Sequence, residues 1–283
     1  MFLHRCRLRW SDLDAQGHVN NAVVIDYLQE ARVAFVRGGP LSELLDTGLV
    51  IVGHRVEYLA PIEYVPHGVD VGLFVTHVGG ARFEVGYELH QGQTLVGRAR
   101  SVLCPFDFAE NRPARLNGDQ RGFLLSHLQE RQDLAALETT DVAGAGTPTP
   151  ITVRWSDLDA YGHVNNAKVF DYIQQARIEA TTAWVPSMAR VGALDSKYLW
   201  LVVRQDVDYL AQIGHRLEPY ALHTVPAAIG RTSIRLASEL VCDEQSRVYA
   251  RGRTVLVCAD SFGRPTELPA AVRSRLERVG PSG

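Results

Sequence analysis

The sequence of 283 residues has little cysteine, and none of it is arranged for metal binding or redox chemistry. Its cysteines form no C-x-x-C pair and no His/Cys cluster with zinc spacing, so we expect no metal site. We expect free thiols in a reducing compartment, with one disulfide pair as the alternative, for Cys6, Cys104, Cys242 and Cys258.

Long hydrophobic runs are also missing. The longest apolar stretches, such as 198–203, are far too short to span a bilayer. The first ten residues carry His4, Arg5, Arg7 and Arg9 and lack the apolar run of a signal peptide. The expectation is a soluble cytoplasmic protein without a membrane span.

Neither sign of charge dominates. The chain has 29 Lys and Arg against 32 Asp and Glu, a net charge of −3, and no basic stretch. This balance argues against a nucleic-acid scaffold or a polybasic membrane binder, so we expect no nucleic-acid partner. It does not argue against an anionic small molecule, which needs only a local basic patch.

What the sequence does contain is one segment twice. Residues 9–32 read RWSDLDAQGHVNNAVVIDYLQEAR, and residues 154–177 read RWSDLDAYGHVNNAKVFDYIQQAR. Of these 24 aligned positions 19 are identical, and the similarity continues more weakly in the pair 56–62 and 207–213. A recent duplication would leave similarity evenly spread. Its concentration here indicates two copies that share one demanding local structure.

The length favours two domains, and composition suggests the boundary. Residues 139–150, TTDVAGAGTPTP, have no periodic apolar pattern and are typical of a linker. We therefore predict a first repeat at 1–138, a linker at 139–150 and a second repeat at 151–283. Apolar residues among charges over 118–137 predict a helix that closes the first repeat.

Each repeat is expected to be an α+β unit. A short strand (3–10 or 151–155) precedes a polar loop (11–20 or 156–165), and then one helix carries an apolar stripe at spacings of three and four. Asn20, Asn21, Asn165 and Asn166 stand where helix N-caps belong. A sheet wrapped around one buried helix describes the hotdog fold. The β-rich segments that would form this sheet are 50–59, 69–78, 83–89 and 95–106 in one copy, and 200–210, 219–224, 232–241 and 248–257 in the other.

The repeated segment contains the motif Asp-x-Asp-x-x-Gly-His-Val-Asn-Asn, followed by a helix that ends in Glu/Gln-Ala-Arg. It resembles the 4-hydroxybenzoyl-CoA thioesterase family of hotdog enzymes. It is also similar to the acyl-acyl-carrier-protein thioesterases of plants and bacteria, which carry two hotdog repeats in one chain. The resemblance covers nearly the whole chain. It implies two tandem hotdog domains paired as an intramolecular pseudo-dimer with active sites between them, and it leaves further association into a homo-oligomer open.

The resemblance also implies roles for particular residues. The second Asp of the motif, Asp14 or Asp159, would act as nucleophile or as general base for water. A backbone N–H at the helix start, that of Asn21 or Asn166, would polarise the thioester carbonyl. Elementary chemistry agrees, because an activated thioester needs only a carboxylate near the carbonyl carbon and donors for the oxyanion. A helix N-terminus supplies such donors, and no cofactor is required.

Other readings of the motif acids are structural. Asp is common in turns, where it satisfies loop amides, and this remains the alternative for Asp14 and Asp159. The first Asp of each motif, Asp12 or Asp157, is expected to pin the loop or to pair with an Arg.

The histidines His18 and His163 either act directly or shape the loop. Plant-type relatives place an Asn two residues after the catalytic Asp and a His four after it. This chain keeps the His and has Gln16 and Tyr161 in place of the Asn. The difference between Gln16 and Tyr161, at a position near the substrate, predicts that the two sites are not equivalent.

Arginines at two strand starts are weaker candidates. Arg82 and Arg231 come shortly after glycines and could meet CoA phosphates, although solvated surface arginine is the default. Tyr58 and Tyr209 are expected in the core or the pocket wall.

Taken together, the residues and the resemblance predict an acyl-CoA thioesterase of fatty acid metabolism that produces a free acid and CoA. One alternative keeps the chemistry and changes the carrier to acyl-carrier protein, which the lack of an obvious basic docking face disfavours. A second is an enoyl-thioester hydratase, which uses Asp and His in a different motif. A third is a non-catalytic acyl-CoA-binding protein, which usually carries an added DNA-binding segment.

Overall fold

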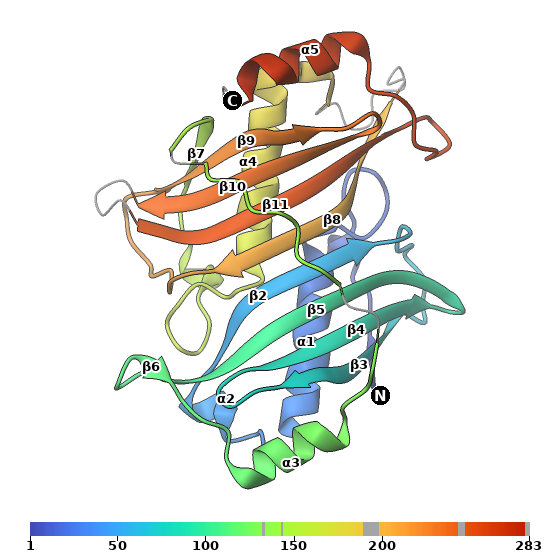
Figure 1. The fold of residues 1–283 in the computed structure, drawn as a ribbon. Helices are drawn as coiled ribbons and strands as arrows, with labels where there is room; N and C mark the ends of the chain where they lie inside the picture. The colour runs from blue at the N-terminus through green and yellow to red at the C-terminus, as the bar shows by residue number, and fades with distance from the viewer. Residues whose placement is uncertain (132–133, 143, 189–197, 243–246, 281–283) are drawn as a thin grey trace. The chain divides into compact units, whose positions relative to one another are not determined.

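The computed structural model describes residues 1–131, 134–142, 144–188, 198–242 and 247–280. It divides into two compact units, Met1–Ala136 and Leu137–Gly283. In each unit one long helix lies across one face of an antiparallel sheet (Figure 1). This arrangement confirms the predicted tandem α+β organisation.

Unit 1 has five main strands in the order β1-β3-β4-β5-β2, and the short β6 pairs with β5. The pairings between these strands are antiparallel. Its elements are β1 (Phe2–Cys6), the 3₁₀ turn η1 (Trp10–Asp12), α1 (Val23–Arg37), α2 (Leu44–Thr47), β2 (Leu49–Tyr58), β3 (Val69–Val78), β4 (Phe83–Gln91), β5 (Thr94–Asp107), β6 (Arg112–Pro113) and α3 (Gly118–Ser126).

Unit 2 repeats this order as β8-β11-β10-β9-β7, again antiparallel throughout. Its elements are β7 (Thr147–Ile151), η2 (Trp155–Asp157), α4 (Lys168–Trp184), η3 (Pro186–Met188), β8 (Leu199–Tyr209), β9 (Tyr220–Ile229), β10 (Ser233–Cys242), β11 (Arg247–Ala259) and α5 (Ala270–Val279).

The apolar stripe of each long helix lies against its own sheet. In α1 the stripe Ile25, Leu28, Ala31 and Phe35 is almost wholly buried, and α4 buries Phe170, Ile173, Ala176 and Ala180 in the same way. Burying each large side chain stabilises the unit by roughly 2 kcal/mol. Gly252 in β11 makes room for α4, because a Cβ there would lie 2.7 Å from Ile173 Cδ1.

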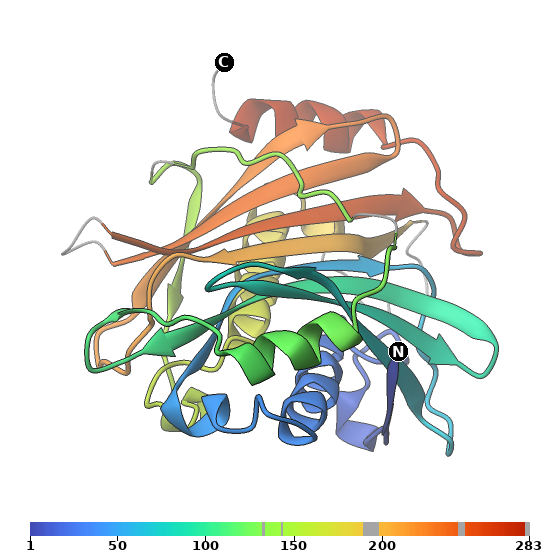
Figure 2. The same cartoon turned by 60° about the horizontal axis from the view of Figure 1, so that its bottom comes forward.

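A second helix closes one end of each unit. In unit 1, α3 lies beside the end of α1 (Figure 2), where the rings of Phe123 and Phe35 are 5.2 Å apart. Asn117 starts α3 through a capping box with Gln120. In unit 2, Leu276 of α5 is fully buried in an apolar cluster with Trp184 and Ile234.

Several predicted boundaries were wrong. The strand expected over 3–10 ends at Cys6, because Trp10–Asp12 turns into η1, and the helix expected over 118–137 ends at Ser126. Residues 132–133 of that range lie outside the described residues. The strand expected over 151–155 is instead β7, Thr147–Ile151, so residues 147–150 of the predicted linker belong to the second sheet. Pro148 and Pro150 are tolerated there because β7 is the outer strand of its unit and pairs only with β9.

The cysteines are free and buried. Burial raises the pKa of the Cys6 thiol to about 12, and it also raises the pKa values of Cys104 and Cys258. The prediction of free thiols is therefore confirmed. Among the described residues, no helix is both long and apolar enough to cross a membrane.

Candidate active site

The loop that carries Asp14 is a tight, closed turn. An isolated β-bridge joins Leu13 to Val19, and the Asp14 N–H donates to the His18 carbonyl at 2.9 Å. The Gly17 N–H donates to the Asp14 carbonyl at 3.0 Å, and Gly17 has φ +86°, a conformation that favours glycine. The Asp14 side chain accepts the Gln16 N–H through Oδ1 at 2.8 Å. One carboxylate oxygen therefore holds the turn, and the half-buried side chain is kept in one place.

The buried carboxylate of Asp12 anchors this turn to the rest of unit 1. Asp12 is 2% exposed and accepts three hydrogen bonds, from Arg9 N at 2.8 Å, Arg9 Nε at 2.9 Å and the Tyr27 hydroxyl at 2.7 Å. Burial, and next the hydrogen bond to Asp12, raise the pKa of Tyr27. Since Tyr27 belongs to α1, Asp12 fixes the loop to the helix, which confirms the structural role expected for it.

The peptide groups at the start of α1 are held by a separate set of contacts. The Asn20 N–H donates to the Asp12 carbonyl at 2.8 Å, and the Asn20 carbonyl accepts the Val23 N–H at 3.0 Å. The Asn20 side chain accepts the Ala22 N–H at 2.9 Å, so it caps the turn before the helix and not α1 itself, whose N-cap is Ala22. The Tyr58 hydroxyl donates to the Asn21 carbonyl at 3.0 Å.

These contacts fix the direction of the predicted oxyanion donor. In a trans peptide the N–H points opposite to the C=O of the same group. Because the Asn20 carbonyl points along the helix to Val23, the Asn21 N–H of that peptide points out of the helix N-terminus. Anions are favoured at such a terminus.

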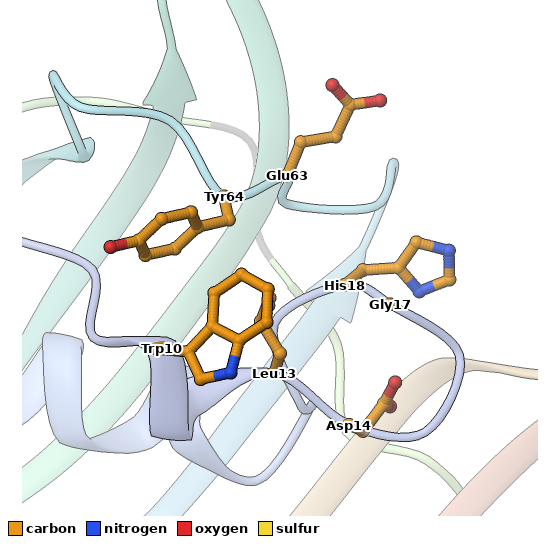
Figure 3. Close-up of a pocket in the computed structure, with 7 residues that line it drawn as sticks. All are labelled: Trp10, Leu13, Asp14, Gly17, His18, Glu63 and Tyr64. Carbon is orange, nitrogen blue, oxygen red and sulfur yellow. The ribbon is translucent and has the colours of Figure 1, made fainter.

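Asp14 and His18 line one open cavity of about 580 Å³. Figure 3 shows Trp10 and Tyr64 next to each other, with Asp14 and His18 extending from the loop beside them; all four residues line the cavity. The Val19 N–H donates to the Ile62 carbonyl at 2.9 Å, which brings the segment with Tyr64 beside the loop. The remaining lining residues are Leu13, Gly17 and Glu63.

Unit 2 repeats the backbone geometry of this loop. The Asp159 N–H donates to the His163 carbonyl at 2.8 Å, and Gly162 has φ +78°. Asp159 Oδ1 accepts the Tyr161 N–H at 2.9 Å and the His163 N–H at 3.3 Å. The Tyr209 hydroxyl donates to the Asn166 carbonyl at 2.7 Å.

The anchor and the helix start of unit 2 match as well. Buried Asp157 accepts Arg154 N at 2.9 Å and the Tyr172 hydroxyl at 2.7 Å. The Asn165 side chain accepts the Ala167 N–H at 3.0 Å, as Asn20 does in unit 1.

Two of the predicted site residues lie away from the carboxylate of their own unit. Arg82 follows the end of β3, whereas Asp14 lies beside residues 62–64, which precede β3. The ten residues of β3 span about 33 Å, so unit 1 does not bring Arg82 and Asp14 together. Arg231 has the same place after β9 and pairs at 3.1 Å with Glu267, both exposed.

Sequence reasoning missed the aromatic wall of the cavity. Trp10 was assigned to a strand, and Tyr64 and Glu63 lie outside the repeated segment. A usable signal existed, since the motif RWSDLD contains a Trp in both copies. Tyr58 and Tyr209 were expected as core or pocket wall, and their hydroxyls prove to hold the peptide after the predicted oxyanion donor. Among the described residues no group of three or more His, Cys, Asp or Glu could hold a metal ion.

Comparison with known proteins defines the class. Residues 8–124 and 153–276 each match the family model of the thioesterase-like superfamily, and together they cover most of the chain. The chain belongs to this superfamily, and membership supports hydrolysis of a thioester as the reaction.

Individual relatives agree with this assignment. A protein of Aquifex aeolicus (strain VF5) named "Putative esterase" is 30% identical over 107 residues, which are 36% of this chain and 83% of that protein. The acyl-ACP thioesterase from Bacteroides thetaiotaomicron has a TM-score of 0.66 at 15% identity, covering 90% of this chain and 96% of its own. The 12:0-ACP thioesterase from Umbellularia californica has a TM-score of 0.68 at 16% identity, covering 91% and 94%. At such identities the two structures establish the tandem hotdog fold alone.

Proposed function

We propose that the protein hydrolyses an acyl-CoA to a free acid and CoA, with Asp14 and Asp159 as the reacting carboxylates. The observation that carries this proposal is the closed loop that holds each carboxylate a few residues before a helix N-terminus, in both repeats. An Asp in a turn does not by itself indicate catalysis. The cavity beside this turn, lined by Asp14 and His18, favours a catalytic role for Asp14.

Two routes use the same geometry. As a nucleophile, a carboxylate oxygen bonds to the carbonyl carbon, the C–S bond breaks and the thiolate takes a proton. Water then hydrolyses the resulting anhydride and restores the carboxylate. As a general base, the carboxylate removes a proton from water, whose oxygen attacks the same carbon; the C–S bond then breaks, the acid is released and the thiolate takes a proton.

In both routes negative charge develops on the carbonyl oxygen. The Asn21 N–H, or Asn166 N–H in the other repeat, is assigned as its donor, and one such donor lowers the barrier by roughly 3 kcal/mol. His18 and His163 are assigned as the proton donors to the departing thiolate. Gln16 and Tyr161 are assigned to substrate contact at the rim of each loop.

Acyl-carrier protein is the second candidate carrier. It is favoured by the likeness in fold to two acyl-ACP thioesterases over nine-tenths of the chain. The chemical step is the same for both carriers and does not distinguish them. A thiol-release assay on acyl-CoA and acyl-ACP substrates that carry the same acyl group decides between them.

The test is the double variant Asp14→Asn/Asp159→Asn, assayed for thiol release on acyl-CoAs from short to long, including an aromatic one. Asn keeps the side-chain oxygen that accepts the Gln16 or Tyr161 N–H, so the loop should stay folded. We expect turnover to fall by about 10³-fold or more while the melting temperature changes little.

Asp46→Asn, an exposed acid in α2, is the matched control and should leave turnover unchanged. Wild-type activity that persists in the double variant would remove Asp14 and Asp159 from the mechanism. Wild-type silence on every acyl-CoA, with activity on acyl-ACP, would replace the carrier and keep the chemistry.

A further inference from the structure

Each motif carries a tryptophan that the folded unit does not bury. Trp10 is 74% exposed and Trp155 is 78% exposed, although an indole is among the side chains that gain most from burial. Neither residue can contribute much to a core. An exposed aromatic face beside a cavity is instead the kind of surface that a ligand covers.

In unit 1 the indole is part of a built wall. Tyr64 meets Trp10 edge to face, with ring centroids 5.4 Å apart and an interplanar angle of 87°. Both rings line the cavity that contains Asp14 and His18, and Figure 3 shows the two rings next to each other. This ring contact with Tyr64 restrains the indole, so the exposed surface of the indole is presented at low entropic cost.

Unit 2 has an equivalent pair of different composition. Trp155 meets His215 edge to face, with centroids 5.7 Å apart and an interplanar angle of 78°. His215 corresponds to Tyr64, because both follow the matched tyrosines, Tyr209 and Tyr58, by six residues. The tryptophan and the edge-to-face arrangement are therefore retained, while the second ring differs.

The position of the wall selects which part of a thioester it contacts. Trp10 and Asp14 are four residues apart, so their Cα atoms are at most about 14 Å from each other. The wall is exposed, which does not suit an acyl chain, because an acyl chain is apolar and favours enclosure. Such a wall suits the thiol side, where the pantetheine arm offers flat amides and a dimethyl group that can pack on an indole face. The adenine of CoA lies beyond that arm.

We propose that Trp10 with Tyr64, and Trp155 with His215, form cradles for the pantetheine arm that CoA and acyl-carrier protein share. This inference rests on the proposed thioester function of Asp14 and Asp159. It assigns the tryptophans to binding and leaves the chemical step to the loop.

The test measures each cradle in a chain where only the neighbouring carboxylate is intact. Trp10→Ala is compared with Trp10→Phe in the Asp159→Asn background, and Trp155→Ala with Trp155→Phe in the Asp14→Asn background. The substrates carry one acyl group on CoA, on acyl-carrier protein, on pantetheine and on a simple alkyl thiol. We expect Ala to raise KM by roughly three- to ten-fold on every carrier with the arm, with kcat nearly unchanged and most affinity kept by Phe.

The KM for the alkyl thioester should not change in the alanine variants, because this substrate has no pantetheine arm. Phe262→Ala is the matched control, since Phe262 is 82% exposed and lies in the turn after β11, and it should change nothing. A loss confined to acyl-CoA would assign the indole to adenine, and a loss confined to acyl-carrier protein would assign it to a protein surface. Either result would contradict the proposed cradle. An equal loss of affinity on the alkyl thioester, or no loss on any substrate, would contradict it as well.

A binding measurement separates this proposal from the proposed activity. Pantetheine itself is titrated calorimetrically into the Asp14→Asn/Asp159→Asn protein with and without Trp10→Ala/Trp155→Ala. Weaker binding of pantetheine by the alanine protein supports the cradle even if the wild type hydrolyses no thioester. Equal binding in both proteins rejects it even if the wild type is active.

Discussion

The two units share a reactive loop and differ in what surrounds it. The hydrogen bonds that set Asp14 and Asp159 match almost bond for bond. The position two residues after each differs, being Gln16 in one and Tyr161 in the other. The comparison shows that sequence identity is concentrated where the backbone geometry is strict, whereas this position, which contributes its backbone N–H to the turn, has diverged.

The sheet interiors differ in the same way. In unit 1, the neighbouring residues Leu73 and Tyr87 are buried, and Arg32 of α1 donates to the Tyr87 hydroxyl at 3.3 Å. The equivalent neighbours in unit 2 are Thr224 and Ser238, whose hydroxyls lie 3.1 Å apart. Unit 2 thus has small, polar side chains at the two positions where unit 1 has large ones. On the proposed function, this difference predicts that the two sites are not equivalent and differ in acyl preference.

The largest expected effect comes from separating the two sites. Asp14→Asn and Asp159→Asn are assayed singly across the acyl-CoA panel. Because each variant keeps one intact loop, a substrate preferred by one site should lose about 10³-fold with one variant and little with the other. Equal losses on every substrate would show that the differences in the interior do not govern selectivity.

The next largest effect is expected for Asp12 and Asp157, which anchor the two loops. It is measured as the change in the free energy of unfolding by urea titration. Asp12→Ala leaves the buried Tyr27 hydroxyl and the Arg9 backbone N–H without their acceptor and removes the ion pair with the exposed Arg9 side chain, so it should destabilise its unit by about 3 kcal/mol. Asp157→Ala should cost about 1 kcal/mol less, since within the part of the chain that the structure describes two groups donate to Asp157, the Arg154 N–H and the Tyr172 hydroxyl. Amide hydrogen exchange in each loop reports which unit has opened. A larger cost for Asp157 would contradict this ranking.

The smallest effect tests the tyrosines that hold the helix start. Tyr58→Phe and Tyr209→Phe each remove one hydroxyl and its hydrogen bond to Asn21 or Asn166. We expect kcat to fall by about three- to ten-fold with KM unchanged, because a loosened peptide affects the oxyanion more than the bound substrate. An unchanged kcat with a lower melting temperature would leave these tyrosines a purely structural role.

Periodic segments were the most predictable from sequence. The strand expected over 69–78 is β3 to the residue, and the strand expected over 50–59 is shifted by one, because alternating apolar residues mark a half-buried sheet. β7 was missed because its alternating prolines look like a linker until β9 is known to pair with it. The loop acids were found from the motif. Trp10 and Tyr64 were not found, because they meet only through the Val19–Ile62 contact, which no local pattern encodes.

The buried cysteines have a consequence for a protein that handles thiols. Each thioester hydrolysed releases a thiol, and such thiols form mixed disulfides with accessible protein thiolates once oxidised. All the cysteines are buried, and burial raises the pKa values of the Cys6, Cys104 and Cys258 thiols, that of Cys6 to about 12, so these thiols hold little thiolate for exchange at neutral pH. Cys6, Cys104 and Cys258 are thereby protected from covalent capture by the leaving group.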